Sequence, residues 1–508
     1  MSETLTVQMQ NHSMMAVACE PSVRHELSEY FSFMVPGAKF MPAYKRRQWD
    51  GKIRLFNNLT CELNVGLFAK LCKFAADRHY HVQMKHSAYG LPNARNTIDH
   101  QQMVKDLASF KPPFEPRDYQ YQAICHAMER KRCLLLSPTG SGKSFIIYNL
   151  MRLCMDDISS KKVLVVVPTT SLVEQMYKDF EDYGYDVEQY CHRVYSGKDK
   201  NTKKPVIITT WQSVYRLSHE WFEQFGTVFG DECHLFKAKS LSTLMNKCTE
   251  AEYRFGTTGT LDGTQVNKLV LEGLFGPTKQ VTFTRDLQEK GTLSELKIEI
   301  LLLKYAKEHR RMMKDKNYQE EVDWIVTHEP RNKLIRNLAL TQTGNTLVLF
   351  QFVEKHGEIL HNLIKEKNGS TFYVHGGTDT SDREAIRGIV EGSKNAIIVA
   401  SLGTFSTGIN IRNLHNIIFA SPSKSQIRVL QSIGRGLRKS DNQQDTHLID
   451  LADNLQVGTK GNFTLKHSAA RMKIYDKEKF DYKIHEVTLW QEETDLYSRL
   501  DSSTEQSA

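Results

Sequence analysis

The segment from Ser137 to Ser144, SPTGSGKS, has the residue types that hold a chain of phosphates. It follows the apolar run CLLL and precedes FIIYNLMRL, so the sequence predicts a strand, a loop and a helix, the order that a phosphate-binding loop requires. Lys143 can reach the β and γ oxygens, and the Ser144 hydroxyl can bind Mg²⁺. Ser137 replaces the usual first glycine without removing any of these groups. Glycine amides and the other loop groups complete the predicted nucleotide contacts: Thr139, Gly140, Ser141, Gly142, Lys143 and Ser144.

Two adjacent carboxylates, Asp231 and Glu232, follow the apolar run TVFG. Strands of an open parallel sheet end at the nucleotide crevice, so this order predicts that both carboxylates reach the phosphate site. Asp231 would hold Mg²⁺ through water, and Glu232 would orient and deprotonate the attacking water. Taken singly, each segment has an alternative interpretation without function: the first could be a glycine turn, and the acidic pair could be a solvated turn. Together they predict an ATPase with Ser144 and Asp231 as its Mg²⁺ ligands.

The elements that must position these groups follow a simple alternation. From Arg117 onward, short β-branched runs such as KKVLVVVP and PVIITT alternate with amphipathic stretches; the pattern breaks near GTLSELKIEILLL and then resumes. Such alternation predicts an α/β fold with two parallel sheets, because 508 residues are too many for one core. We expect a small N-terminal α/β accessory domain (1–105), two lobes (106–290 and 291–455) and a basic helical C-terminal segment with a disordered tail (456–508).

From Arg117 to about Asp453 the chain resembles the superfamily 2 helicases, through the phosphate loop, the DECH sequence and the motifs below. The resemblance implies two tandem RecA-like lobes that couple ATP hydrolysis to movement on DNA or RNA. EPRDYQYQA resembles the adenine-recognition element of this family, in which Gln120 would read the base edge and Tyr119 or Arg117 would pack near it. TTGTL (257–261) resembles the motif that couples hydrolysis to movement.

Other motifs of this resemblance imply contacts with a nucleic-acid backbone. VVPTTSLVEQ and TTWQS would present amides and hydroxyls to phosphates from the first lobe, and YVHGGTDTSDR and SLGTFSTGIN from the second. Phosphate contacts position a strand without reading its sequence, so we expect a sequence-tolerant and salt-sensitive motor. The implied contacts are Pro168, Thr169, Thr210, Trp211, His375, Gly376 and Thr404, with Gly408 on the nucleotide side.

QSIGRGLR, from Gln431 to Arg438, resembles the arginine-finger motif of the family. Arg435 and Arg438 lie about one helical turn apart, so both guanidinium groups can neutralise charge on the γ-phosphate and hold the lobes closed around ATP. Hydrolysis would remove that contact and let the lobes part, one ratchet step per cycle. A solvated basic helix face is the alternative for this motif.

A basic and aromatic cluster, AYKRRQWDGKIRLF, lies in the N-terminal domain at residues 43–56. Arg46, Arg47 and Lys52 could contact duplex phosphates while Trp49 stacks on a base. The alternative is that Trp49 belongs to the core and the cations are solvated. With this cluster included, the whole chain is most similar to the recombination helicases of T-even phages. That likeness implies branched DNA substrates, namely forks, Holliday junctions and R-loops, in recombination, replication and repair.

The composition is that of a globular protein, with 40% hydrophobic and 25% charged residues, and a net charge of +8 suits a polyanionic partner. Nine cysteines without a CxxC pair argue against a disulfide framework or a zinc ribbon. The chain has no run of about 18 uncharged apolar residues, and its first residues lack the layout of a signal peptide. We therefore expect a cytoplasmic protein without a membrane partner, in the host cytoplasm if it is phage-encoded.

Several alternatives to a DNA helicase stay open at this point. An RNA helicase or the motor subunit of a restriction system would use the same two-lobed core. A phosphate-loop ATPase that acts on protein partners, or an idle DNA clamp, belongs to a different class. ATP hydrolysis stimulated by nucleic acid would separate a motor from both. The partners that the resemblance implies are DNA, RNA–DNA hybrids, and single-strand-binding or recombination proteins.

Overall fold

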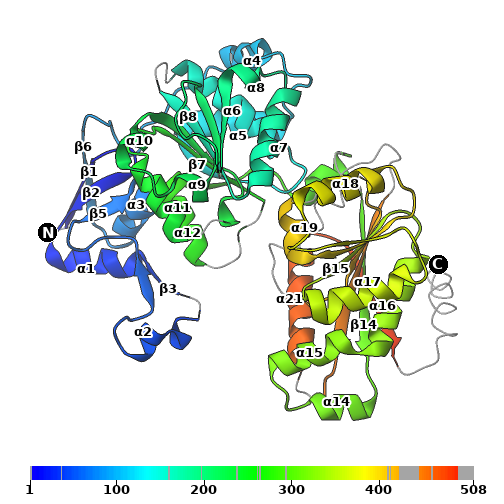
Figure 1. Ribbon diagram of the computed structural model, residues 1–508. Coiled ribbons are helices and arrows are strands. Elements are labelled where there is room, and N and C mark those ends of the chain that lie inside the picture. Colours follow the sequence, from blue (N-terminus) through cyan, green and yellow to red (C-terminus); the bar gives the residue numbers. More distant parts are fainter. Residues whose placement is uncertain are drawn as a thin grey trace. The chain divides into compact units, whose positions relative to one another are not determined.

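The chain folds into two compact units, Met1–Thr282 and Phe283–Ala508, each described here by itself (Figure 1). Helix α13 (Thr284–Glu289) belongs with the second unit, whereas the sequence pattern places it in the first lobe; its Thr284 hydroxyl lies 3.0 Å from Glu478. No helix in the described part of the chain is long and apolar enough to cross a membrane. The computed structural model describes residues 3–35, 37–157, 161–195, 197–235, 238–259, 261, 265–291, 295–408, 411, 413–422, 445–458 and 461–489.

The N-terminal domain is a four-stranded sheet with helices on its buried face. Alternate residues of the first strand point inward, and the helices pack on them with side chains such as Leu27 and Phe74. A two-stranded ribbon and a short helix extend from this domain (Figure 1). The sheet order is β5-β2-β1-β6. The elements are β1 (Thr4–Met9), β2 (Met14–Ala18), α1 (Pro21–Tyr30), β3 (Ser32–Met34), η1 (Ala38–Phe40), α2 (Pro42–Lys45), β4 (Lys52–Arg54), β5 (Glu62–Asn64), η2 (Val65–Leu67), α3 (Phe68–Asp77) and β6 (His81–Lys85).

A buried arginine joins this domain to the first lobe. Arg254 is 1% exposed and donates to the His12 carbonyl at 3.0 Å, to the Ser13 hydroxyl and to the Met245 carbonyl. A Cβ at Gly66 would lie 2.2 Å from the carbonyl oxygen of Glu272, so glycine is required for this close approach of the two backbones. The N-terminal domain and the first lobe therefore form one unit.

The first lobe is a seven-stranded parallel sheet in the order β13-β7-β12-β11-β8-β10-β9. Its central strands are buried on both sides, because α5, α6 and α7 cover one face and α11 and α12 the other. The strands are β7 (Arg132–Leu136), β8 (Lys162–Val167), β9 (Cys191–Val194), β10 (Val206–Thr210), β11 (Phe225–Gly230), β12 (Tyr253–Thr258) and β13 (Thr278–Gln280). The helices are α4 (His100–Ser109), α5 (Asp118–Arg130), α6 (Lys143–Asp157), α7 (Thr170–Asp182), α8 (Val187–Tyr190), α9 (Trp211–Val214), α10 (His219–Glu223), α11 (Ala238–Lys247) and α12 (Gln265–Phe275).

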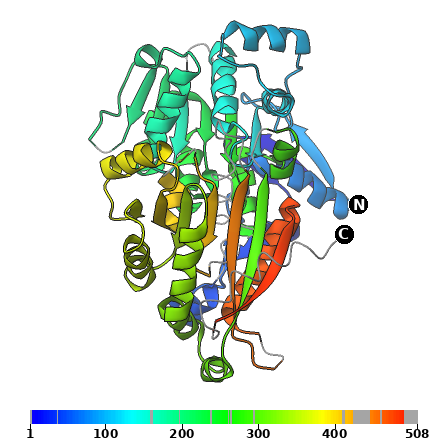
Figure 2. The same cartoon turned by 90° about the vertical axis from the view of Figure 1, so that its right-hand side faces the viewer.

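The second unit has a seven-stranded parallel sheet in the order β16-β17-β15-β18-β19-β14-β20. Figure 2 shows β14 (green) between β19 (orange) and β20 (red). The strands are β14 (Leu296–Lys304), β15 (Thr346–Phe350), β16 (Thr371–Val374), β17 (Ile397–Ser401), β18 (Asn416–Phe419), β19 (Thr446–Asn454) and β20 (Tyr482–Thr488). The helices are α14 (Lys307–Met313), α15 (Tyr318–Thr327), α16 (Glu329–Thr341), α17 (Glu358–Lys365), α18 (Thr380–Glu391), α19 (Leu402–Gly408) and α21 (Phe463–Glu478).

The C-terminal segment is part of this second sheet and is only partly helical. α21 ends at Glu478, and the chain continues as β20 beside β14, so the prediction of a helical C-terminal segment is wrong for residues 482–488. Buried Arg471, which bonds Asp450 at 2.7 Å, fixes α21 to the sheet. The alternation of apolar and polar residues in YKIHEVT suits an edge strand, which is covered on one face only.

Candidate nucleotide and nucleic-acid site

The carboxyl ends of the strands place the predicted residues of the first lobe along one edge of its sheet. The phosphate loop follows β7, and Asp231 follows β11, which is separated from β7 by β12 alone. Pro168 follows the next strand, β8, and Thr210 ends β10 beyond it. One half of the edge therefore carries the predicted nucleotide residues and the other half the predicted nucleic-acid residues.

The phosphate loop is held in a curved conformation by its glycines and by Gln120. Gly140 and Gly142 have φ angles of 81° and 78°, a region that a side chain disfavours. A Cβ at Gly142 would lie 2.4 Å from the Gln120 side-chain nitrogen, which donates to the Ser141 carbonyl at 2.8 Å. Ser141 is buried, and its hydroxyl lies 2.6 Å from that of Ser137. The residue that replaces the first glycine thus stabilises the loop from inside.

Arg117 and Tyr119 form hydrogen bonds that connect them to the phosphate loop. The Tyr119 hydroxyl donates to the Ser141 carbonyl at 3.1 Å, and the Arg117 guanidinium donates to Tyr119 at 3.1 Å. The Gln120 side-chain oxygen, Oε1, accepts from the backbone N–H of Arg117 at 2.9 Å. This network ties the start of α5 to the phosphate loop; adenine recognition by these residues stays a prediction.

Lys143 and Glu232 form the centre of the site. The Lys143 ammonium lies 3.2 Å from the Glu232 carboxylate and donates to the Ser137 carbonyl at 3.3 Å. Glu232 has a φ of 45°, which is a strained region for a residue with a side chain, and strain of this kind is concentrated at functional sites. A hydrogen bond from its own N–H to Asp231 at 2.9 Å supports the conformation. His234, next to Glu232 at 3.4 Å, also contacts the Thr258 hydroxyl and so connects the carboxylate to the end of β12.

The pKa values of the two carboxylates are shifted in opposite directions because their surroundings differ. Burial and the neighbouring Glu232 charge raise the pKa of Asp231 to about 6, although Lys143 and a 2.6 Å hydrogen bond from Thr257 oppose the rise. Burial alone would raise the pKa of Glu232 as well, but the Lys143 ammonium and His234 outweigh it, and the pKa is lowered. Glu232 is therefore ionised at neutral pH, as a base must be.

Hard oxygen groups near the phosphate loop suit Mg²⁺. Ser144 offers a hydroxyl, and Asp231 offers a buried carboxylate whose pKa is raised by burial and by the Glu232 charge, two effects that a bound cation would offset. The described part of the chain has no cluster of three or more His, Cys, Asp or Glu side chains that could hold a metal. Mg²⁺ needs no such cluster, because it is bound by one or two protein oxygens together with water and substrate phosphates.

The predicted nucleic-acid motifs of the first lobe lie next to each other at the carboxyl ends of β8 and β10. Thr169 caps the start of α7, its hydroxyl accepting from Leu172 N–H at 3.4 Å. The Gln212 side chain donates to the Pro168 carbonyl at 3.2 Å, which joins the two motifs. Thr210 is buried and bonds Ser213. Trp211 is half-buried against Tyr215, with ring centroids 5.6 Å apart.

The corresponding residues of the second lobe also lie at neighbouring strand ends. His375 and Gly376 follow β16, and Arg383 donates to both of their carbonyl oxygens, at 3.3 and 3.1 Å. Thr404 follows β17; it is buried, and its hydroxyl lies 2.7 Å from Ser401. Gly408 ends α19. Gln431, Arg435 and Arg438 lie outside the described residues.

Some side chains of the N-terminal basic and aromatic cluster are exposed, and others are hydrogen-bonded within the domain. Arg46 and Arg47 are exposed and have no ion pair within the described part of the chain. Lys52 bonds Glu29, and the Trp49 ring nitrogen donates to the Lys52 carbonyl at 2.8 Å, so these two residues hold the extension together. Sequence reasoning did not single out Phe40, which is 81% exposed at the end of η1, just before α2.

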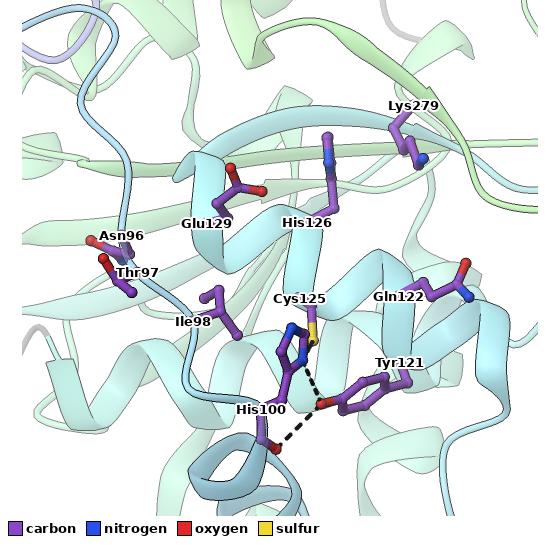
Figure 3. Close-up of a pocket in the computed structure, with 10 residues that line it drawn as sticks. All are labelled: Asn96, Thr97, Ile98, His100, Tyr121, Gln122, Cys125, His126, Glu129 and Lys279. Carbon is purple, nitrogen blue, oxygen red and sulfur yellow. Dashed lines mark hydrogen bonds between the residues drawn. The ribbon is translucent and has the colours of Figure 1, made fainter.

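A separate pocket of about 560 Å³ lies along α5 (Figure 3), and Gln120 is not among the residues that line it. His100 and Tyr121 meet there at 3.0 Å, and Cys125 and His126 also line it. None of the predicted nucleotide contacts does. Burial lowers the pKa of His126, so this side chain is neutral at physiological pH. The pocket is not part of the phosphate site.

Three family models match the chain: the N-terminal domain of the DNA helicase UvsW over residues 4–85, the res subunit of type III restriction enzymes over 113–263, and the helicase conserved C-terminal domain over 329–440. The ATP-dependent DNA helicase uvsW of Enterobacteria phage T4 is 35% identical over 505 residues, which cover 96% of this chain and 100% of the relative. The probable helicase D10 of Escherichia phage T5 is 22% identical over 382 residues, 72% of this chain and 76% of the relative. The crystal structure of T4 UvsW matches with a TM-score of 0.52 at 33% identity, covering 96% of this chain and 100% of that one.

Two RecA-like lobes with these motifs make this protein an ATP-dependent helicase of superfamily 2, which binds DNA and hydrolyses ATP. The predicted fold class, including the small N-terminal α/β domain, is confirmed. The match to the restriction subunit covers only the first lobe, a core that many motors share. The chain belongs to the UvsW family of DNA helicases.

Proposed function

We propose that this helicase remodels branched DNA, such as forks, Holliday junctions and R-loops, during recombination, replication and repair. The observation that carries the proposal is the basic extension that the N-terminal domain adds to the first lobe. Arg46 and Arg47 are exposed on it, and Arg254 anchors the domain that bears it. A motor that follows one strand needs only the strand-binding edge of its lobes. A cationic surface elsewhere on the same compact unit suits a second DNA arm.

The catalytic roles that we propose follow from the geometry of the first lobe. Lys143 leaves the Glu232 carboxylate to bind the β and γ oxygens, and Glu232, released from that ion pair, orients the water and takes its proton. Ser144 and Asp231 would hold Mg²⁺, which neutralises charge on the phosphate oxygens. His234 and Thr258 would pass the change at Glu232 to β12.

The second lobe would complete the reaction and the grip on the strand. We propose that Arg435 and Arg438 neutralise the γ-phosphate, and that Gln431 and Gly408 line the nucleotide side. His375, Gly376 and Thr404 would hold backbone phosphates, in parallel with Pro168, Thr169, Thr210 and Trp211 of the first lobe. Contacts of this kind read no sequence, so the preference for branched DNA must come from shape.

A comparison of substrates tests the proposal. ATP hydrolysis and unwinding rates are measured on single strands, forks, four-way junctions and RNA–DNA hybrids of equal length. We expect forks and junctions to give the highest unwinding rates at subsaturating DNA. Equal rates on plain duplexes with single-stranded tails would contradict the proposal, and stimulation by RNA alone would favour an RNA helicase instead.

A further inference from the structure

The hydroxyl of Tyr183 lies 2.8 Å from the hydroxyl of Ser144. Ser144 is half-buried in the first turn of α6, where we place one Mg²⁺ ligand. Tyr183 directly follows α7 and belongs to none of the motifs recognised in the sequence. The fold therefore brings a second hydroxyl to the proposed metal site, from a different helix.

Aromatic neighbours hold the Tyr183 ring in place. Its centroid lies 5.1 Å from that of Phe145, 5.4 Å from Tyr148 and 5.7 Å from Phe114, and the first and last of these contacts are edge-on. The Tyr183 N–H donates to Asp179 at 3.0 Å and ends the helix. A ring packed in this way keeps its hydroxyl in one position, so the bond to Ser144 is directional.

The direction of that bond decides how well Ser144 can bind a cation. A serine hydroxyl has one hydrogen and two lone pairs. When Ser144 donates its hydrogen to Tyr183, both lone pairs are available to a cation on the other side. A cation also repels the hydroxyl hydrogen, which favours the same arrangement. Tyr183 thus has the position of an outer partner that orients a metal ligand, a type of partner whose loss weakens metal binding about 10- to 100-fold.

We propose that Tyr183 is a positioning residue that orients the Ser144 hydroxyl toward Mg²⁺ and links the Mg²⁺ site to α7. The inference rests on the proposed placement of Mg²⁺ at Ser144. α7 has 13 residues and spans about 20 Å. Its first turn is capped by Thr169 in the proposed strand-binding loop, and Tyr183 follows its last residue. A shift of α7 on DNA binding would change the Tyr183–Ser144 bond, so the Mg²⁺ affinity of the nucleotide-bound protein becomes dependent on DNA.

The first test measures Mg²⁺ binding without turnover. The full chain binds a fluorescent ADP, and Mg²⁺ is titrated for the wild type, Tyr183→Phe and Tyr185→Phe. We expect Tyr183→Phe to need about tenfold more Mg²⁺ for half-saturation while its Mg²⁺-free affinity for ADP is unchanged. Tyr185→Phe is the matched control, because its hydroxyl contacts only the Met155 sulfur, at 3.5 Å, among its hydrogen-bond partners in the described residues. An unchanged Mg²⁺ requirement in Tyr183→Phe, or an equal loss of Mg²⁺-free binding, would overturn the inference.

The second test adds saturating single-stranded DNA to the same titration. In the wild type we expect DNA to shift the half-saturating Mg²⁺ concentration, and in Tyr183→Phe we expect that shift to be lost. No shift in the wild type, or the same shift in both proteins, would overturn the link through α7. Ser144→Ala separates this inference from the proposed site. Wild-type Mg²⁺ dependence in Ser144→Ala would refute the placement of Mg²⁺, whereas a loss in Ser144→Ala with normal behaviour of Tyr183→Phe refutes only the role of Tyr183.

Discussion

At the scale of single residues, Lys143 has two partners, the Glu232 carboxylate and the ATP phosphates, and it cannot hold both at once during a reaction cycle. In the described structure the Glu232 carboxylate pairs with Lys143 at 3.2 Å, yet catalysis requires Lys143 on the phosphates. The ion pair therefore competes with ATP. Glu232→Gln removes this competition together with the base. We expect the variant to bind an ATP analogue at least as tightly as the wild type while its turnover falls at least about 100-fold. Equilibrium binding and single-turnover hydrolysis check the two parts, and undiminished hydrolysis would remove Glu232 from the mechanism.

The buried Asp231 carboxylate should cost the ligand-free protein stability at neutral pH. Its pKa is raised from 3.8 to about 6, by burial first and by Glu232 second. The folded state therefore retains a proton that the unfolded state releases, and the free energy of unfolding falls as pH rises from about 4 to about 6. Above about pH 6 the free energy of unfolding is lower than it is below pH 4 by the full amount, on the order of 2–3 kcal/mol.

Asp231→Asn tests this account of the pKa. Asparagine keeps an oxygen that can accept the hydrogen bonds from Glu232 and Thr257 but carries no charge. In EDTA we expect the variant to be more stable than the wild type by about 2 kcal/mol at pH 7.5 and equal to it near pH 4, by denaturant titration at both values. A stability advantage that persists at pH 4 would mean that the raised pKa is not its cause.

At the scale of elements, patterns that depend on local sequence predicted most of the fold. The runs before Ser137 and Asp231 became β7 and β11 because β-branched and apolar residues buried on both faces suit only the centre of a parallel sheet. β20 was missed because an edge strand alternates polar and apolar residues, and this one lies in a segment rich in lysine, which resembles a solvated helix.

The site residues likewise divide into those that local sequence predicts and those that it does not. Lys143 lies in a recognisable loop, whereas Tyr183 meets Ser144 only through the packing of α7 on α6.

The N-terminal sheet and the first lobe share an interface that no local pattern marks. Arg254 lies in β12 of the lobe, and burial lowers its pKa to about 10. Its three acceptors, His12, Ser13 and Met245, would lose their donor in Arg254→Ala. We expect a loss of about 3 kcal/mol, from unsatisfied acceptors and an internal cavity. Deleting the whole domain would remove two of these acceptors, His12 and Ser13, so it is not a clean test of DNA binding.

A thermal melt of Arg254→Ala checks this prediction, with Arg95→Ala as control. Arg95 is in an exposed ion pair with Glu129 at 3.2 Å, and its removal should change stability by less than about 0.5 kcal/mol. The first transition of Arg254→Ala should fall by at least about 5 °C. Melting temperatures that agree between the two variants would show that the interface does not depend on this residue.

At the scale of the whole molecule, the first unit carries two surfaces of different chemistry that we propose for DNA. One is the edge of the lobe, where the motifs of Thr169 and Thr210 lie beside the nucleotide residues. The other is the extension with Arg46 and Arg47, remote in sequence from every ATPase motif. Because Arg254 fixes the two parts to each other, DNA held by the extension has a defined position relative to the strand-binding edge. Affinity for a branch point would then come from simultaneous binding of two arms.

The double variant Arg46→Ala/Arg47→Ala tests this division, because each arginine that contacts a phosphate should contribute about 0.9 to the salt dependence of binding. We expect the slope of log K against log salt to fall by about 2 for a four-way junction and to change little for a single strand, with the ATPase rate at saturating single-stranded DNA unaltered. Lys73→Ala/Lys85→Ala is the matched control, since both lysines are exposed in the same domain but outside the extension. Binding isotherms at four or more salt concentrations provide the slopes. If both double variants lose the same slope, the effect is one of net charge and the extension is not a DNA site; if neither loses any, the second arm is held elsewhere.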